Sequence, residues 1–197
     1  MVTLDDVTSA RRVLAGRIHR TPLIGSTEIG RRVGAPVYFK LENLQKTGSF
    51  KVRGVLNKIA ALGPEERARG LLAASAGNHA QALAWAATAE GVASTVVMPA
   101  DAPRTKVQAT QQYGATVVIE QDRMKLFSRA DELTKERGLT FVPPFDDPLV
   151  IAGQGTVGLE ILEDLPEVGT VVVPIGGGGL IAGVAVAIKR QRPNAKV

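Results

Sequence analysis

The 197-residue chain, with 45% hydrophobic and 22% charged residues, has the composition of a soluble globular protein, and no run approaches the roughly 18 apolar residues that span a bilayer. It has no cysteine, which excludes disulfide bonds and cysteine nucleophiles, and it has Asp5 and Asp6 where a signal peptide would be basic, so we expect a cytoplasmic protein. The net charge of +5 does not predict nucleic-acid binding, because the basic residues are scattered and only 4% of residues are aromatic.

Short apolar segments alternate with amphipathic segments along the chain. In chain order the pattern predicts strand 37–41, helix 52–62, strand 71–74, helix 80–89, strand 95–98, helix 103–112, strand 117–119, helix 124–137, strand 140–142, helix 150–162, strand 171–173 and helix 180–191. This alternation is typical of a three-layer α/β fold, in which helices cover both faces of a parallel sheet. Such sheets bind ligands at the carboxyl ends of their strands, where the glycine-rich turns of this sequence lie. Lys196-Val197 resembles the opening of another strand, so we expect a fold truncated at its C-terminus.

A run of four glycines follows the predicted strand 171–173. This tetraglycine loop consists of Gly176, Gly177, Gly178 and Gly179. Its backbone amides and the start of the next helix attract an anion, and a phosphate is the expected guest. No Lys-Ser/Thr pair follows, so it is not a Walker A loop. A dinucleotide site stays open, because Gly177, Gly179 and Ala182 fit G-x-G-x-x-A, and so does a turn that only permits tight packing.

Lys51 follows Thr47-Gly48-Ser49-Phe50, between a predicted strand and a predicted helix. Most lysines are solvated surface residues, but this one begins a helix, where a cation opposes the helix dipole. Phe50 is an apolar neighbour. An amine in such a place can be shifted toward its neutral, nucleophilic form, as an imine-forming lysine requires. Lys51 is therefore a candidate nucleophile.

The segment Ser75-Ala76-Gly77-Asn78-His79 ends one strand and opens the next helix. Its backbone amides and the Ser75 hydroxyl could hold a carboxylate. The alternative is that Ser75 or Asn78 only caps the helix. His79 could act as a base or simply pack. Since His19 is the only other histidine, we expect no metal site.

Asp146-Asp147-Pro148 supplies a pair of acidic side chains. Asp before Pro at a helix start is usually a cap, so we interpret this pair as structural. No Gly-x-Ser-x-Gly motif is present, which argues against a serine hydrolase of the α/β type.

Five segments, taken in order, resemble the threonine dehydratase and serine racemase family of pyridoxal-phosphate (PLP) enzymes. They are KLENLQKTGSFKVRG at Lys40–Gly54, SAGNHAQALA at Ser75–Ala84, VMPADAPRTKVQATQQYGA at Val97–Ala115, PFDDPLVIAGQGTVGLEI at Pro144–Ile161 and VVVPIGGGGLIAGVA at Val171–Ala185. Five segments in register are far more specific than any one of them. The resemblance extends over nearly the whole chain.

The resemblance implies the fold-type II, tryptophan-synthase-beta-like PLP fold. Residues 1–72 and 151–197 would form an incomplete large PLP-binding domain, and residues 73–150 a small domain. The implied cofactor is pyridoxal 5'-phosphate, and the implied partners are a small amino-acid substrate and, for the full-length protein, a second copy in a homodimer. Neither nucleic acid nor a membrane is an expected partner.

The resemblance also implies a role for each candidate residue. Lys51 would hold PLP as a Schiff base, with Phe50 near the ring and Asn78 bonded to the ring's phenolic oxygen. The amides of the tetraglycine loop and of Leu180 would hold the phosphate. The substrate carboxylate site would be lined by Ser75, Asn78 and His79.

The implied reaction begins when the Lys51 amine removes the substrate Cα proton, and it ends in a 2-oxo acid and ammonia. Racemases of this group carry a second serine where this chain has Ala76, which has no exchangeable proton. We therefore expect deamination of L-threonine or L-serine. A serine or threonine racemase, another β-eliminating or β-replacing PLP enzyme, and a cofactor-binding fragment without turnover stay open as alternatives.

Overall fold

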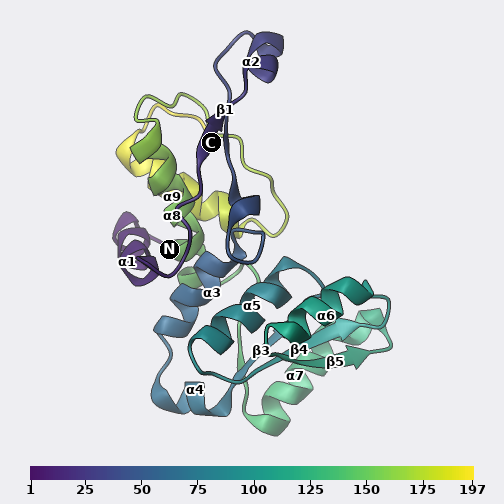
Figure 1. Cartoon of the computed structure of the whole chain (residues 1–197). Helices are drawn as coiled ribbons and strands as arrows, with labels where there is room; N and C mark the ends of the chain where they lie inside the picture. Colours follow the sequence, from purple (N-terminus) through teal and green to yellow (C-terminus); the bar gives the residue numbers. More distant parts are fainter.

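The computed structural model covers residues 1–197, and its elements form two parts that meet at one helix, α3 (Figure 1). In chain order the elements are α1 (Leu4–Leu14), β1 (Leu23–Gly25), α2 (Thr27–Val33), β2 (Tyr38–Lys40), the 3-10 turn η1 (Glu42–Leu44), α3 (Lys51–Ala60), α4 (Pro64–Arg69), β3 (Leu71–Ala74), α5 (Asn78–Ala89), β4 (Ser94–Pro99), α6 (Arg104–Gln112), β5 (Thr116–Glu120), the 3-10 turn η2 (Arg123–Lys125), α7 (Leu126–Arg137), β6 (Thr140–Phe141), α8 (Pro148–Asp164) and α9 (Gly179–Gln191). None of these helices is both long enough and apolar enough to cross a membrane.

The first part is a four-stranded parallel sheet with helices on both faces. Its strand order is β5-β4-β3-β6, and each neighbouring pair is parallel. Along β3, Leu71 and Ala73 pack in the cluster that contains α5, whereas Leu72 and Ala74 pack against α7. This alternation follows from the two-residue period of a strand. The predicted three-layer α/β fold is confirmed here.

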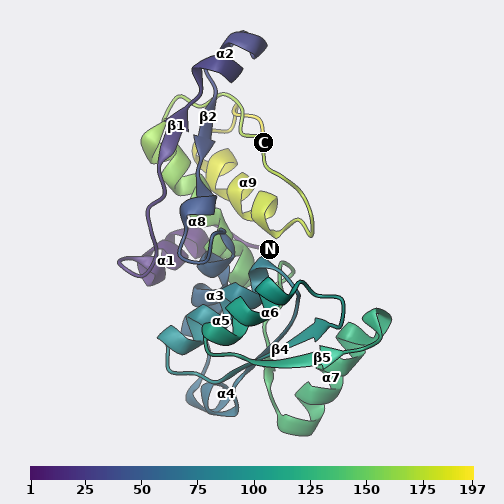
Figure 2. The same cartoon turned by 45° about the vertical axis from the view of Figure 1, so that its right-hand side comes forward.

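The second part consists of α1, α8 and α9 together with an antiparallel hairpin of β1 and β2 (Figure 2). The prediction of a strand at 37–41 is confirmed as β2, but β2 pairs with β1 outside the parallel sheet. The helix α2 joins the two strands, has no buried residue and projects from the rest of the chain (Figure 2).

The predicted strand at 171–173 is wrong. Only Thr170 and Lys196 form an isolated parallel bridge there, with the Val171 amide donating to the Lys196 carbonyl at 2.8 Å, and the residues from Val172 to the tetraglycine loop belong to no strand. An apolar run becomes a strand only when a neighbouring strand accepts its backbone hydrogen bonds. With a single bridge available, Val172 and Ile175 stay exposed.

Glycines let α8 approach its neighbours at backbone distance. A Cβ added at Gly153 would lie 2.6 Å from both the Arg53 carbonyl oxygen and the Gly54 Cα, so α3 and α8 touch through their main chains. At Gly155 an added Cβ would lie 2.8 Å from the Gly183 carbonyl oxygen of α9. The three helices α3, α8 and α9 are therefore packed as closely as their backbones allow.

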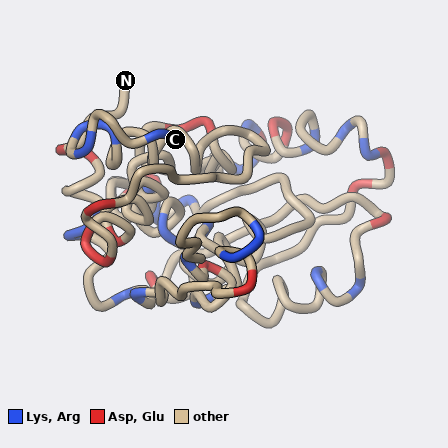
Figure 3. The backbone as a smooth tube through the Cα atoms, turned by 90° about the horizontal axis from the view of Figure 1, so that it is seen from above, with Lys and Arg blue, Asp and Glu red and all other residues tan.

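Basic and acidic residues are interspersed along the backbone of both parts (Figure 3). Several form exposed pairs, such as Arg123 with Asp101 at 2.7 Å and Arg129 with Glu132 at 2.8 Å. Exposed pairs of this kind contribute little to stability, roughly 0–1 kcal/mol each.

The α3–α8 contact can be tested with Gly153→Ala. Alanine normally favours a helix over glycine by about 1 kcal/mol, but here its Cβ meets backbone atoms that cannot move aside. We expect a loss of about 1–3 kcal/mol in the free energy of unfolding, measured by chemical denaturation. The control is Gly169→Ala, where an added Cβ meets nothing within 4 Å. A Gly153→Ala chain as stable as the parent would contradict this packing.

Candidate active site

Lys51 is the first residue of α3, and its amine is half-buried. The Lys51 Nζ donates a hydrogen bond of 2.6 Å to the carbonyl oxygen of Pro144 and lies 5.3 Å from the centre of the Phe50 ring. Burial lowers the pKa of Lys51, because removing water disfavours the charged form. The sequence prediction of an amine shifted toward its neutral form agrees with this environment.

The tetraglycine loop packs on Phe145, the residue next to the Lys51 acceptor. A Cβ added at Gly177 would lie 2.2 Å from the Phe145 ring, and one at Gly179 would lie 2.7 Å from the Phe145 carbonyl oxygen. The Lys51 amine and the tetraglycine loop therefore meet at the same two-residue segment, Pro144-Phe145. The candidate amine and the candidate anion-binding loop thus contact neighbouring residues of one segment.

The other two glycines of the loop keep space free. An added Cβ at Gly176 or Gly178 would meet nothing within 4 Å. Gly178 has φ +86°, a conformation that residues with side chains rarely adopt, and it is the N-cap residue of α9, which has no side-chain cap. The first amides of α9 are thus free of side-chain partners and fit a bound phosphate. Leu180 lies in this first turn.

The segment after β3 leads into α5 without a side-chain cap. Gly77 is the N-cap residue of α5, and it makes no capping hydrogen bond. The interpretation of Ser75 or Asn78 as a helix cap is therefore wrong: Ser75 Oγ instead accepts a 3.2 Å bond from the Gly77 amide, and Asn78 is exposed. The uncapped first turn of α5 leaves its amides available to a carboxylate.

His79 is buried behind this turn, and its two ring nitrogens differ. Nε2 lies 2.9 Å from the Val142 carbonyl oxygen, which can only accept, so Nε2 carries the proton. Nδ1 is buried without a partner. The pKa of His79 is lowered to about 4, mainly by burial and also by the charge of Lys51, whereas the bond to Val142 acts in the opposite direction. His79 is a neutral side chain with a free acceptor.

Five buried side-chain polar atoms have no hydrogen-bond partner: Thr47 Oγ1, Ser49 Oγ, His79 Nδ1, Ser94 Oγ and Gln154 Nε2. Thr47 and Ser49 lie in the segment that leads to Lys51, and the charge of Lys51 acts on His79. Buried polar groups normally have hydrogen-bond partners. Together with the open tetraglycine loop, the unpartnered atoms of Thr47, Ser49 and His79 fit a polar guest that carries a phosphate. The residues present therefore fit the cofactor that the sequence resemblance implies.

Asp147 is a cap, as its position before Pro148 predicts. Its Oδ1 accepts bonds from the amides of Leu149 and Val150 at 2.9 and 3.1 Å, and its Oδ2 lies 2.7 Å from Lys58 Nζ. Asp146 is exposed.

Pro144 and Phe145 are site residues that sequence reasoning missed. A signal was available, because they follow β6 as Ser75 follows β3, and ligands gather at the carboxyl ends of parallel strands. The buried ion pairs of Arg53 with Glu42 and Glu160 were also missed, and for these the sequence pattern gives no signal.

Two cavities of the chain lie away from these groups. One of about 290 Å³ is lined by α1, α3 and the start of α8, and one of about 380 Å³ lies beside Phe127 of α7 and Phe141. Neither is lined by Lys51 or by the tetraglycine loop. We place the candidate site by its chemical groups, because neither cavity combines an amine of lowered pKa with an anion-binding turn.

Comparisons with known proteins agree on one family. The family model described as "Pyridoxal-phosphate dependent enzyme" matches residues 14–197. The L-threonine ammonia-lyase of Thermotoga maritima is 53% identical over 198 residues, which cover 100% of this chain and 49% of that protein.

Solved structures give the same result. The structure of maize serine racemase matches with a TM-score of 0.95 and 39% sequence identity. The match covers 98% of this chain and 59% of the racemase chain. A threonine deaminase from T.th. has a TM-score of 0.92 at 45% identity, covering 98% of this chain and 63% of its own. This chain thus spans between about half and two thirds of the length of these relatives. The backbone likeness does not separate racemase from deaminase.

The lowered pKa of His79 predicts acid sensitivity. The folded value of about 4 lies below the ordinary value of 6.5, so between these pH values the unfolded chain binds more protons. The contribution of the neutral His79 ring to the free energy of unfolding is fully present above pH 6.5. It decreases by roughly 3 kcal/mol as the pH falls to about 4.

The measurement is the unfolding free energy against pH for the parent and for His79→Gln, whose difference isolates this group. We expect the variant to lose less stability between pH 7 and pH 4. An NMR titration in which the folded His79 ring protonates near pH 6.5 would contradict the assignment.

Proposed function

The chain belongs to the family of pyridoxal-phosphate dependent enzymes, and we propose that it is the cofactor-binding part of an ammonia-lyase that converts L-threonine or L-serine to a 2-oxo acid and ammonia. One observation carries the proposal: the half-buried Lys51 amine is fixed 2.6 Å from the Pro144 carbonyl, beside the tetraglycine loop that packs on Phe145. The identity of 53% to an L-threonine ammonia-lyase supports this reaction class.

In this proposal the cofactor would be held between Lys51 and the start of α9. Lys51 would bear it, with Phe50 beside the lysine and Asn78 as a hydrogen-bonding side chain for it. The amides of the tetraglycine loop and of Leu180 would hold its phosphate, which is supported by the absence of a side-chain cap on α9. Pyridoxal phosphate, when bound, supplies the electron sink that makes the substrate Cα–H bond acidic.

The substrate carboxylate would lie at the uncapped start of α5. Backbone amides there can donate to it, and Ser75, Asn78 and His79 line the turn. His79 cannot offer a positive charge to the carboxylate near neutral pH, because its pKa is about 4. It supplies shape and a fixed Nδ1 acceptor, so the carboxylate depends on the α5 amides for its stabilisation.

The Lys51 amine serves as the base at Cα. Its lowered pKa increases the share of the neutral amine, whose lone pair can take the proton, and the Pro144 carbonyl accepts a hydrogen bond from Nζ whether the amine is neutral or charged. Removal of the Cα proton and departure of the β-hydroxyl as water leave an unsaturated product. Return of one water molecule then gives the 2-oxo acid and ammonia.

Ala76 favours deamination over racemisation. Racemisation requires a second proton donor on the face opposite Lys51, and the methyl group of Ala76 has no exchangeable proton. The second candidate function is nonetheless a serine or threonine racemase or another β-eliminating enzyme, which the likeness to maize serine racemase supports. A cofactor-binding chain without turnover is the third candidate.

The division into a large domain of residues 1–72 and 151–197 and a small domain of residues 73–150 stays a prediction. So do the homodimer and the cytoplasmic location.

The first test of this function is Lys51→Ala in the 197-residue chain with added PLP. We expect loss of the visible absorbance of the bound cofactor and a decrease in 2-oxo acid release of at least about 10³-fold, because nucleophile and base are removed together. Lys46→Ala is the matched control, since Lys46 is an exposed lysine of the same segment. Borohydride reduction followed by peptide mapping identifies the modified lysine.

Absorbance and turnover that survive Lys51→Ala would show that Lys51 is not the cofactor lysine. Cofactor binding by the parent chain without any 2-oxo acid release would favour the third candidate.

The choice between deamination and racemisation is tested with Ala76→Ser. The parent with L-serine should give 2-oxo acid in large excess over D-serine, measured by chiral chromatography, whereas the new hydroxyl should raise the share of D-serine several-fold. The control substitution Ala76→Gly adds no proton donor and should leave the product ratio as it is. D-serine as the main product of the parent would reverse our choice.

A further inference from the structure

Arg53 lies two residues after Lys51 on α3, and its side chain is fully buried. All five of its N–H groups have acceptors. The bonds run from Nε and Nη2 to Glu42 at 2.8 and 2.7 Å, from Nη1 and Nη2 to Glu160 at 2.6 and 3.0 Å, and from Nη1 to Thr156 Oγ1 at 3.1 Å. Two bidentate carboxylates on one guanidinium fix its position and orientation.

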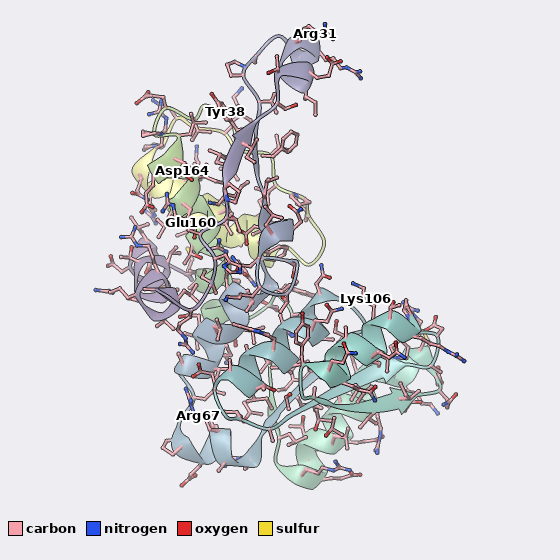
Figure 4. The ribbon with its side chains drawn as sticks, viewed as in Figure 1. Arg31, Tyr38, Arg67, Lys106, Glu160 and Asp164 are labelled. Carbon is pink, nitrogen blue, oxygen red and sulfur yellow. The ribbon has the colours of Figure 1, made fainter.

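Lys40 completes this arrangement and balances its charge. Its Nζ lies 2.7 Å from Glu160 Oε2 and 2.5 Å from the Thr21 carbonyl oxygen. Glu160 lies on α8 one turn before Asp164, which Lys40 also approaches at 3.7 Å (Figure 4). We call Lys40, Glu42, Arg53, Thr156 and Glu160 the Arg53 cluster. Its core of two cations and two carboxylates is neutral, as burial requires.

The start of α3 has no other anchor of this kind. Its N-cap residue, Phe50, makes no side-chain cap, and a cation in the first turn of a helix opposes the helix dipole. The first turn that carries Lys51 would therefore fray if nothing else held it. The bonds between Glu42 and Arg53 close the segment that contains Thr47, Ser49 and Lys51, so its two ends are tied together.

The same cluster ties this segment to α8. Thr156 and Glu160 belong to α8, whose first residue follows the loop that contains Pro144. A second bond, between Lys58 and Asp147 at 2.7 Å, joins the other half of α3 to the N-cap of α8. The amine of Lys51 and the carbonyl of Pro144 are thus both placed with respect to α8.

We propose that Arg53 is a positioning residue, which with Glu42 and Glu160 holds the first turn of α3 so that the Lys51 amine stays half-buried and opposite the Pro144 carbonyl. This inference rests on the proposed function only in giving that amine a catalytic use. The geometry itself belongs to the chain without any ligand.

The test labels lysines competitively with acetic anhydride in the cofactor-free chain and follows each lysine by peptide mass across pH. Glu42→Gln and Glu160→Gln keep the side-chain shape but remove one charge and at least one acceptor of Arg53. We expect the pH midpoint of Lys51 labelling to rise toward that of the exposed lysines, because the amine leaves its buried place. The affinity for added PLP should fall about tenfold.

The matched control is Glu163→Gln. Glu163 also belongs to α8 and also pairs with arginines, Arg11 and Arg20, but at the surface and without a bond to α3. Its variant should keep the parent's midpoint. Leu133→Ala, on the buried face of α7, controls for general destabilisation: it should lower the melting temperature and leave the Lys51 midpoint unchanged.

Parent-like midpoints in both Glu42→Gln and Glu160→Gln would overturn the proposal and leave the cluster a purely structural one. If both variants fail to fold, Arg53→Lys, which keeps the charge but loses the five-donor fork, decides by the same criterion. A parent chain that binds no PLP would contradict the proposed function. It would leave the positioning role of Arg53 standing, since the labelling is measured without cofactor.

Discussion

The backbone contact of α8 with α3 and α9 determines where the candidate site lies. Lys51 begins α3 and the tetraglycine loop begins α9, and these two helices have little direct contact. Each is placed through α8, by Gly153 against Gly54 and by Gly155 against Gly183. Larger side chains at these crossings would move the amine and the anion-binding turn apart, so the glycines of α8 act on the site without touching it.

The two cations at the start of α3 show how burial acts differently on arginine and lysine. Arg53 is buried, which by itself lowers the pKa, but its bonds to Glu42 and Glu160 outweigh that effect and raise it. Lys51 has one neutral acceptor, the Pro144 carbonyl, and burial lowers its pKa. The first turn of α3 thus contains Arg53, whose permanent charge fixes it to two carboxylates, and Lys51, whose amine can lose its proton.

The parallel sheet and its helices could be predicted from the sequence because their signals are local. The apolar runs of β3 and β4 predict strands, and the segments after them predict helices, from their own residues alone. Strand β2 was predicted, but β1 and its pairing with β2 in a hairpin were missed, because β1 is short and its Ile24 stays exposed. Helix α1 was missed although Thr3 and Asp6 form a capping box that the sequence displays.

Candidate site residues could be predicted only where a single segment contains both the reactive or ligand-binding residue and the local pattern that marks it. Lys51 and the tetraglycine loop stand out as residue types in unusual positions. Pro144 takes part through a carbonyl oxygen that every residue possesses, and Arg53 through partners 11 and 107 residues away. Contacts of this kind depend on the folded chain, so no local pattern records them.

The wide separation of these contacts in the sequence also has a consequence for biosynthesis. Lys51 leaves the ribosome roughly 100 residues before α8, the helix that α3 must meet, which at about 5–20 residues per second means a delay of roughly 5–20 s. During this interval the amine has neither its carbonyl partner nor its buried surroundings. The surroundings that lower the pKa of Lys51 therefore exist only after α8 has been made, and the order of synthesis places the burial of the amine after that of the sheet that follows α3.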